Sequence, residues 1–142
     1  MADPDCLFCK IVAGEIPATV VAETERAIAF MDINPATRGH VLVIPRAHAR
    51  DIHELAAEDL AAVAATAQEI AGRAVRRLGA DGVNLLNSNG TAAWQTVFHV
   101  HMHVIPRYVG DPLRLPWSPA PGSMDDIAAA GAELAREQER RS

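Results

Sequence analysis

Apolar residues recur every three or four positions over one long segment of the chain. This spacing places them on one face of an α-helix, while Glu69 and Arg73 fall on the opposite face. Gly79 follows the last apolar position, as is typical of the residue just beyond a helix. The segment therefore predicts an amphipathic helix of about six turns, whose small side chains allow close packing on a sheet. The apolar positions are Leu60, Val63, Ala64, Ala67, Ile70, Ala71, Ala74, Val75 and Leu78.

Short runs rich in β-branched and apolar residues lie on both sides of this helix, and turn residues bound each run. Ahead of them, residues 6–14 predict a short helix that ends at Gly14. Neighbouring strands joined by short turns, with one long helix between two of them, indicate an antiparallel sheet covered on one face. The predicted fold class is therefore α+β. The predicted strands are residues 19–22, 27–32, 39–45, 82–86 and 97–105.

The last part of the chain has a different character. Prolines recur from Pro106 to Pro121, which excludes regular structure there. Beyond them, Ser123 and Asp126 resemble the capping box that opens a helix. We therefore expect a polar C-terminal helix.

Composition narrows the class of protein. The chain has 142 residues, of which 49% are hydrophobic and 22% charged, as expected for one globular domain. Its net charge of −5 argues against a clamp on nucleic-acid backbones. No apolar run reaches the roughly 18 to 20 residues of a membrane span, and the N-terminus lacks the basic segment of a signal peptide. Two cysteines are too few for a disulfide framework, so we expect a cytoplasmic protein. From the charge and the apolar runs we expect neither a nucleic-acid nor a membrane partner.

A row of three histidines carries the strongest chemical signal. His99, His101 and His103 alternate with apolar residues, so on a strand all three point to one face and the apolar residues would be buried against the long helix. An exposed polar face would favour Thr, Lys or Glu, so we interpret the row as a site. Either the imidazoles bind one metal, or one is a nucleophile that its neighbours orient. Adjacent histidines disfavour one another's protonation, which would keep an attacking nitrogen neutral.

These residues resemble a known family. Residues 99–105, His-Val-His-Met-His-Val-Ile, match the signature of the histidine triad (HIT) family. Further motifs agree in order and spacing, and the resemblance is greatest to the Hint-type, zinc-containing hydrolases of nucleoside phosphoramidates. It implies a single HIT domain over 1–142, with a core at about 6–107 and a Pro-rich segment and C-terminal helix at 108–142. The other matching motifs lie at 6–17, 29–35, 39–45 and 95–98.

The resemblance also implies the architecture and assembly of the chain. The expected fold is a five-stranded antiparallel sheet with one long helix and a short N-terminal helix, and the sheet would extend across a homodimer. The alanines of the long helix fit a close-packed interface of that kind. Trp117, in Leu-Pro-Trp-Ser-Pro, resembles a tryptophan that reaches the partner's active site in Hint-type proteins.

A two-step hydrolysis is the activity that the resemblance implies. His101 would attack the α-phosphorus of a purine nucleoside phosphoramidate, or a related nucleoside-monophosphate conjugate, and water would hydrolyse the nucleotidyl-histidine. His103 would contact the phosphate and assist proton transfer, and the carbonyl of His99 would accept a hydrogen bond from His101. Nucleotidyltransferases of this superfamily have Gln at the position of His103, so hydrolysis is favoured. The predicted catalytic residues are therefore His101, His103 and His99.

The residues that match the family's ribose and base contacts are one acid and a set of apolar side chains that would form a slot. Asp32 matches the acid that accepts both ribose hydroxyls, although an aspartate before Asn-Pro is also an ordinary turn residue. The slot residues, taken singly, would be plain core, and only the resemblance makes them a purine pocket. They are Leu7, Phe8, Ile11, Ile16, Phe30 and Ile33.

The positions that contact phosphate in the family match this chain only in part. Thr96 matches a hydroxyl that bonds the phosphate, and Gln95 precedes it in the same motif. Where the family usually has Asn or Gln, the chain has a serine between two asparagines, and any of the three is a candidate phosphate contact. Where this chain has Trp94 the family commonly has Gly, and the backbone there approaches the leaving group. The bulky indole should reshape that side of the site, so we do not infer the leaving-group preference from relatives. The three candidates are Asn87, Ser88 and Asn89.

A second constellation suggests a metal. Cys6 and Cys9, in Cys-x-x-Cys, suit two thiolates on one tetrahedral zinc, although a redox pair or incidental cysteines would explain the spacing as well. Some triad proteins bind zinc with a Cys, Cys, His, His set, and His48 and His99 match its other two positions. The resemblance thus implies one structural Zn²⁺ per chain, which would pin the N-terminal helix to the strand with the catalytic histidine.

Two further functions remain alternatives to this hydrolase. The first is a dinucleoside polyphosphate hydrolase, and the second is a nucleotide-binding or interaction module with only residual hydrolysis. The intact histidine row disfavours a pure binding module, but an intact site does not identify a substrate. A zinc module for nucleic acids is excluded by the net charge and by the lack of a basic stripe.

Overall fold

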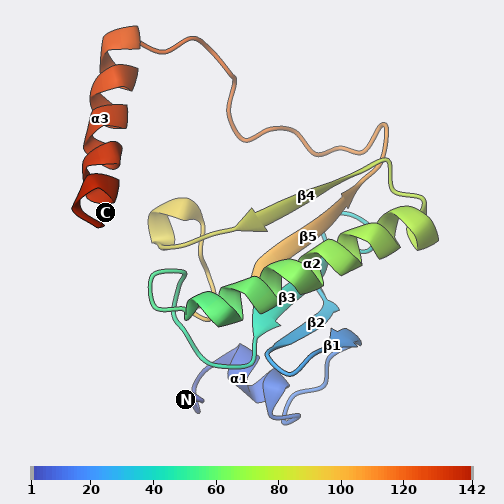
Figure 1. Ribbon diagram of the computed structural model, residues 1–142. Coiled ribbons are helices and arrows are strands. Elements are labelled where there is room, and N and C mark those ends of the chain that lie inside the picture. The colour runs from blue at the N-terminus through green and yellow to red at the C-terminus, as the bar shows by residue number, and fades with distance from the viewer. Residues whose placement is uncertain (1, 142) are drawn as a thin grey trace. The chain divides into compact units, whose positions relative to one another are not determined.

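The computed structural model describes residues 2–141, which divide into two compact units bounded by Pro112 and Leu113. The first unit is a sheet with a long helix on one face and a short helix near the N-terminus (Figure 1). The second unit contains α3 (Met124–Arg141). The elements of the first unit are α1 (Leu7–Val12), β1 (Val20–Glu23), β2 (Ala27–Met31), β3 (Val41–Pro45), α2 (Ala57–Leu78), β4 (Gly82–Asn87), the 3₁₀ turn η1 (Thr91–Ala93) and β5 (Met102–Arg107).

The five strands lie in the order β1-β2-β3-β5-β4, and every neighbouring pair is antiparallel. Because α2 connects β3 to β4, β5 is the strand that enters between them. Its His103 lies opposite Leu42 of β3 on one side and Leu86 of β4 on the other. The predicted α+β fold, with an antiparallel five-stranded sheet, is confirmed.

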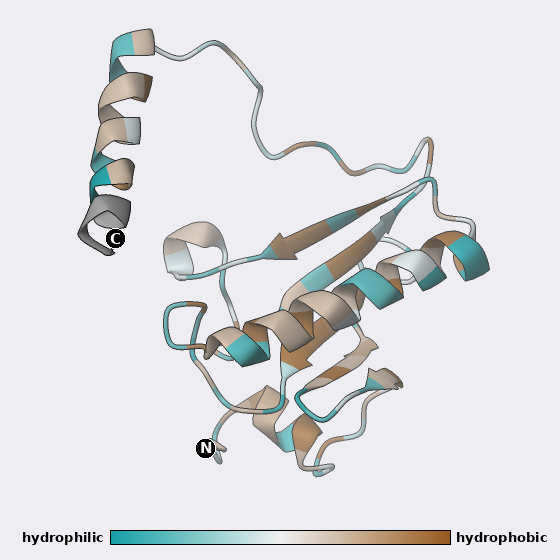
Figure 2. Cartoon of the chain, viewed as in Figure 1, coloured by the Kyte–Doolittle hydropathy of each residue, from teal (hydrophilic) through white to brown (hydrophobic). Residues whose placement is uncertain are grey.

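Both faces of the sheet are covered, whereas the sequence predicted cover on one face only. In β2, Ala27 and Ala29 pack under α2, while Ile28 and Phe30 pack with Phe8 of α1 on the other face. Strands buried on both sides are apolar at consecutive positions instead of alternating. Accordingly, β2 and β3 are hydrophobic along their length, and α2 is hydrophobic only in stripes (Figure 2).

The long helix agrees with its prediction. Val63, Ala67 and Ile70 lie in the core cluster with residues of β2, β3 and β5. Its first turn is tied to the turn before β2 by a salt bridge of 2.9 Å between Arg26 Nη1 and Asp59 Oδ1. Gly79 ends it in the left-handed conformation, with φ 70°. This tie and the apolar stripe set the position of α2 on the sheet.

The strand that carries the histidines begins later than predicted. The alternation predicted a strand over 97–105, but β5 starts at Met102 and includes Pro106. Before it, Val100 N–H donates to the Ala49 carbonyl at 2.9 Å, so the chain leaves the β3 ladder to follow the loop after β3. Phe98 is not in the core, because the Arg50 guanidinium lies over its ring at 4.5 Å from the centroid.

The second unit is simpler. Residues 113–123 have no helix or strand, as the prolines predicted. Ser123 Oγ accepts a hydrogen bond from Asp126 N–H at 3.3 Å, which caps α3 as expected. No helix among residues 2–141 combines the length and apolarity needed to span a membrane.

Gly39 allows β3 to pass close to the end of α2. It has φ 89°, and a Cβ there would lie 2.4 Å from Leu78 Cδ1. Gly79 has a similar φ of 70° but open space around it. Gly79→Ala should therefore cost only the left-handed backbone penalty, roughly 1 kcal/mol, and Gly39→Ala roughly 2 to 4 kcal/mol, because the clash is added. Urea unfolding of both variants measures the difference, and equal losses would contradict the close approach.

Candidate active site and metal cluster

The three predicted histidines lie together but face different partners. His99 lies in a bend of the chain before β5, His101 directly precedes β5, and His103 lies within that strand. The His101 and His103 rings are 5.1 Å apart, and both line one pocket. The His99 side chain is completely buried and faces Cys6, Cys9 and His48 instead. The row therefore serves two sites, because its first imidazole belongs to the metal cluster and the other two belong to the pocket.

A backbone carbonyl determines which nitrogen of His101 is free. His101 Nδ1 lies 2.9 Å from the carbonyl oxygen of His99, which can only accept, so Nδ1 carries the hydrogen. Its Nε2 therefore has the lone pair. Burial lowers the pKa of His101 below 6.5, opposed by the bond to His99 and by Asp32, so the ring is neutral near pH 7. Burial, and not the neighbouring histidines that the sequence suggested, is the main cause.

His40, which sequence reasoning did not assign, determines the tautomer of His103. Ala36 N–H donates to His40 Nδ1 at 2.9 Å, so the hydrogen of a neutral His40 lies on Nε2. That Nε2 is 2.8 Å from His103 Nδ1, which must accept, and the hydrogen of His103 then lies on its own Nε2. Burial, His101 and His40 lower the pKa of His103 to about 4. Although His40 lies in the matching motif at 39–45, its partner is 63 positions away.

The pocket has a volume of about 360 Å³ and lies between α1, β2 and the turn that follows β2. Phe8 forms its inner wall, with its ring edge-on to His101 at 5.2 Å and to Phe30 at 5.5 Å. All six residues of the predicted apolar slot line it, together with Asp32, Thr96, His101 and His103. The lining residues that the sequence did not suggest are Pro17, Ala18, Met31, Asn34, Leu42 and Val97.

Asp32 lies beside the histidines and is partly engaged. One carboxylate oxygen accepts Asn34 N–H at 2.8 Å, which is the turn role that the sequence left open. The other lies 3.5 Å from His40 Nε2. A carboxylate has about four acceptor sites, so Asp32 can hold the turn and still accept hydroxyls from a ligand.

Four predicted phosphate contacts lie outside the pocket lining: Asn87, Ser88, Asn89 and Gln95. Asn87 Nδ2 donates to the His101 carbonyl at 2.9 Å, and Asn89 Oδ1 accepts Ile52 N–H at 2.7 Å. Gln95 Nε2 donates to the carbonyls of Arg50 and Val97, and its Oε1 accepts Gly90 N–H. These bonds hold the loop that leads to Thr96, so Gln95 is satisfied without a ligand. Ser88 is buried, and its contact with phosphate stays a prediction.

Trp94 has an unusual backbone conformation. Its φ is 74°, and it is the non-glycine residue at positive φ in the described chain. Glycine adopts such a value without strain, whereas a tryptophan does so rarely. The indole is 61% exposed, two residues before the pocket residue Thr96.

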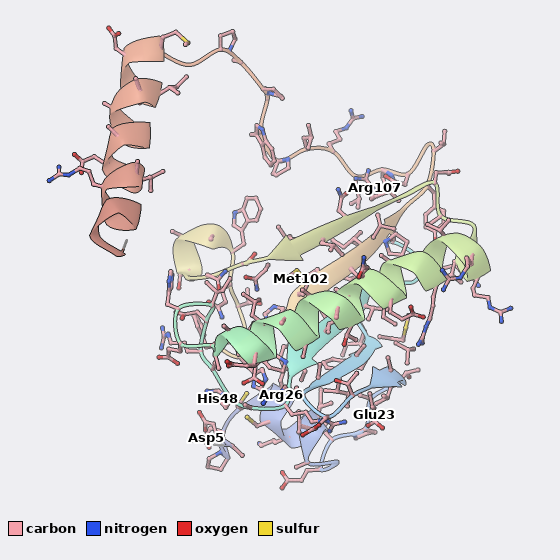
Figure 3. All side chains as sticks on the ribbon, viewed as in Figure 1. Asp5, Glu23, Arg26, His48, Met102 and Arg107 are labelled. Carbon is pink, nitrogen blue, oxygen red and sulfur yellow. The ribbon has the colours of Figure 1, made fainter. Side chains whose placement is uncertain are left out.

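The four predicted metal ligands are brought together by α1, the loop after β3 and the segment before β5. Cys9 Sγ lies 3.3 Å from His48 Nδ1 and 3.6 Å from His99 Nδ1. Cys6 Sγ lies 3.5 Å from His99 Nδ1, and the two Nδ1 atoms are 3.3 Å apart. Tetrahedral zinc with nitrogen and sulfur ligands separates those ligands by about 3.3 to 3.7 Å. The donor set thus fits zinc in kind, number and spacing, and His48 lies beside the N-terminal helix (Figure 3).

Outer contacts orient these ligands. His99 Nε2 donates to the Pro45 carbonyl at 2.8 Å, which leaves Nδ1 free to bind a metal. His48 Nε2 lies 4.0 Å from Asp3 Oδ2, which is too long for a hydrogen bond. Burial raises the pKa of the Cys9 thiol, so only a cation would hold it as a thiolate at neutral pH.

The structure has an antiparallel sheet, a pocket lined by two histidines and a neighbouring cluster of Cys and His side chains. Comparisons with known proteins identify the family that combines these features. Residues 13–110 match the HIT domain, so the chain belongs to the HIT family. It is 40% identical over 130 residues, 91% of this chain and 95% of the relative, to adenosine 5'-monophosphoramidase hnt1 of Schizosaccharomyces pombe.

Solved structures of similar proteins agree with the fold. A HIT family protein from Bacillus anthracis matches with a TM-score of 0.87 at 38% identity, covering 96% of this chain and 99% of that one. A zinc-bound histidine triad family protein from Mycobacterium smegmatis matches with a TM-score of 0.75 at 41% identity, covering 96% and 97%. The zinc-bound relative and the four ligand side chains that meet in this structure both support a zinc site.

The bond between His40 and His103 can be tested by NMR. In the wild type, ¹⁵N shifts should show a protonated Nε2 on His103 and titration near pH 4, because the pKa of His103 is about 4. His40→Ala removes one cause of that low pKa and opens the site, so titration should move to higher pH and the tautomers should mix. His53→Ala, at an exposed histidine, is the control. An unchanged His103 titration in His40→Ala would mean that His40 does not determine the state of His103.

Proposed function

We propose that this HIT-family protein hydrolyses nucleoside-monophosphate conjugates, with purine nucleoside phosphoramidates as the preferred class, through a nucleotidyl-His101 intermediate. The observation that carries the proposal is the free Nε2 of a neutral His101 at the inner end of an apolar pocket of nucleoside size. The phosphoramidase name of the fission-yeast relative supports the same reaction class.

The covalent step uses the lone pair of His101 Nε2. It forms a bond to the α-phosphorus, the bond from phosphorus to the leaving nitrogen breaks, and that nitrogen departs with its electron pair and takes a proton from water. Positive charge then develops on the imidazole, and the His99 carbonyl stabilises it through Nδ1–H. In the second step, water attacks phosphorus, the bond to Nε2 breaks with its electrons returning to nitrogen, and the water proton passes to solvent.

His103 and Thr96 hold the phosphate in this scheme. The tautomer that His40 imposes puts N–H on His103 Nε2, which donates to an anionic phosphoryl oxygen. Thr96 adds a hydroxyl from the pocket lining. A neutral donor suits both the pentavalent transition state and the intermediate, since it needs no change of protonation between the two steps.

The metal cluster and the assembly complete the proposal. Cys6, Cys9, His48 and His99 would hold one structural Zn²⁺ per chain, which would cross-link three segments and leave no open position for substrate. We further propose that the chain works as a homodimer in the cytoplasm, with its sheet extended across the interface.

His101→Ala tests the nucleophile. The variant should lower turnover of adenosine 5'-phosphoramidate by on the order of 10⁴-fold, because the covalent route is lost. Affinity for AMP should change little, since the base and ribose contacts remain. Steady-state kinetics and calorimetry measure the two quantities, with His53→Ala as the control. More than a tenth of wild-type turnover in His101→Ala would refute the assignment.

Asp32 tests the substrate class. A carboxylate that accepts both ribose hydroxyls should discriminate against 2′-deoxyadenosine phosphoramidate by roughly tenfold or more in kcat/KM, because the deoxy sugar leaves an acceptor unpaired. Asp32→Asn should weaken the ribo substrate and shrink that ratio. Guanosine should be accepted about as well as adenosine, since the slot is apolar. Equal rates for ribo and deoxy substrates in the wild type would leave Asp32 as a turn residue only.

A further inference from the structure

The metal cluster and the nucleotide pocket share backbone at two places. The first is α1, where Cys6 and Cys9 belong to the cluster while Leu7 and Phe8, which lie between them, line the pocket. The second is His99, whose side chain belongs to the cluster and whose carbonyl accepts the hydrogen of His101. The two sites therefore cannot rearrange independently.

The helix α1 has few other attachments. It has 6 residues, and the hydrogen bonds of its backbone stay within residues 3–16. In the described part of the chain, the polar contacts that join residues 6–12 to the sheet and its loops all run through the Cys6 and Cys9 sulfurs. Otherwise α1 is held by apolar packing, chiefly of Phe8 on Phe30 and the histidine rings. Since a helix this short is not stable on its own in water, its order depends on these contacts.

We propose that zinc in this cluster and a nucleotide in the pocket bind with positive coupling, so that metal occupancy regulates nucleotide affinity. This rests on the proposed function, since it takes the pocket as the nucleotide site. Zinc orders the wall formed by Leu7 and Phe8 and steadies the His99 carbonyl before the nucleotide arrives, so the nucleotide no longer bears that ordering cost. Coupling of this kind is reciprocal: the factor by which zinc strengthens nucleotide binding equals the factor by which the nucleotide strengthens zinc binding.

The primary experiment compares wild-type protein loaded with zinc and freed of it by chelator, with metal content measured in both. The loaded form should contain one zinc per chain and bind AMP with a Kd about fivefold or more below that of the apo form. Circular dichroism checks that the apo form is folded. The reverse measurement needs only loaded protein: saturating AMP should slow transfer of zinc to a chromophoric chelator by a similar factor.

Partial ligands separate the two connections. Adenosine tests the α1 wall, since it has the base and no phosphate, and ribose 5-phosphate tests the His99–His101 connection, since it has no base. We expect adenosine to retain most of the coupling, because the residues between the two cysteines contact the base. Leu7→Ala should reduce the coupling factor without changing the zinc affinity of the free protein, because Leu7 is 45% exposed and is no ligand. Lys10→Ala, on the same helix but in neither site, is the matched control and should keep the full factor.

The outcomes are distinct. Equal AMP affinity with and without zinc, together with zinc release that AMP does not slow, would overturn the coupling and leave the proposed function intact. No zinc uptake by the purified chain would overturn it as well. If neither form bound AMP, the proposed function would fail and the coupling with it. Should the apo form unfold, AMP-slowed zinc release from the loaded form decides the question, because it requires no apo protein.

Discussion

A neutral imidazole has one lone pair, and the active site depends on which nitrogen holds it. In this protein, hydrogen bonds to backbone groups decide which ring nitrogen carries the hydrogen, and backbone groups do not titrate. The His99 carbonyl accepts from His101 Nδ1, the Pro45 carbonyl accepts from His99 Nε2, and Ala36 N–H donates to His40 Nδ1. These bonds direct the lone pair of His101 toward the pocket and that of His99 toward the cysteines, and they direct the N–H of His40 Nε2 toward His103 Nδ1. The chemistry of the site therefore follows from the path of the chain around it.

Burial gives this arrangement its effect at neutral pH. Apolar residues at consecutive positions of β2 and β3 bury both faces of the sheet, with α2 on one face and α1 on the other. The rings of His101 and His103 lie in that second layer, and burial is the first cause of the lowered pKa of each. An exposed row of the same residues would be partly protonated near pH 6.5 and would lose its free lone pair. The small α1 helix thus forms one wall of the pocket and helps to keep His101 neutral.

The metal cluster and the pocket are built from the same short stretches of chain. His99 contributes its side chain to the Cys and His cluster, and its carbonyl accepts a hydrogen bond from His101. At residues 6–9, Cys6 and Cys9 belong to the cluster and the two residues between them line the pocket wall, because ligand spacing of three positions leaves those two free to face elsewhere. The two sites are therefore built on the same stretches of backbone.

The sequence by itself determined the periodic elements and, through its motifs, most of the pocket. The stripe from Leu60 to Leu78 and Gly79 set the long helix because local spacing and a local stop signal suffice for it. The tertiary structure alone decided where the histidine strand begins, since residues 97–101 follow the loop after β3 and no period in the sequence records that partner. It also decided the role of His40, which depends on a bond to a residue 63 positions away. Finally, it decided between the two roles that the sequence left to the His99 side chain, in the row or among the metal ligands, because a side chain's direction depends on the groups packed around it, and those come together only when the chain folds.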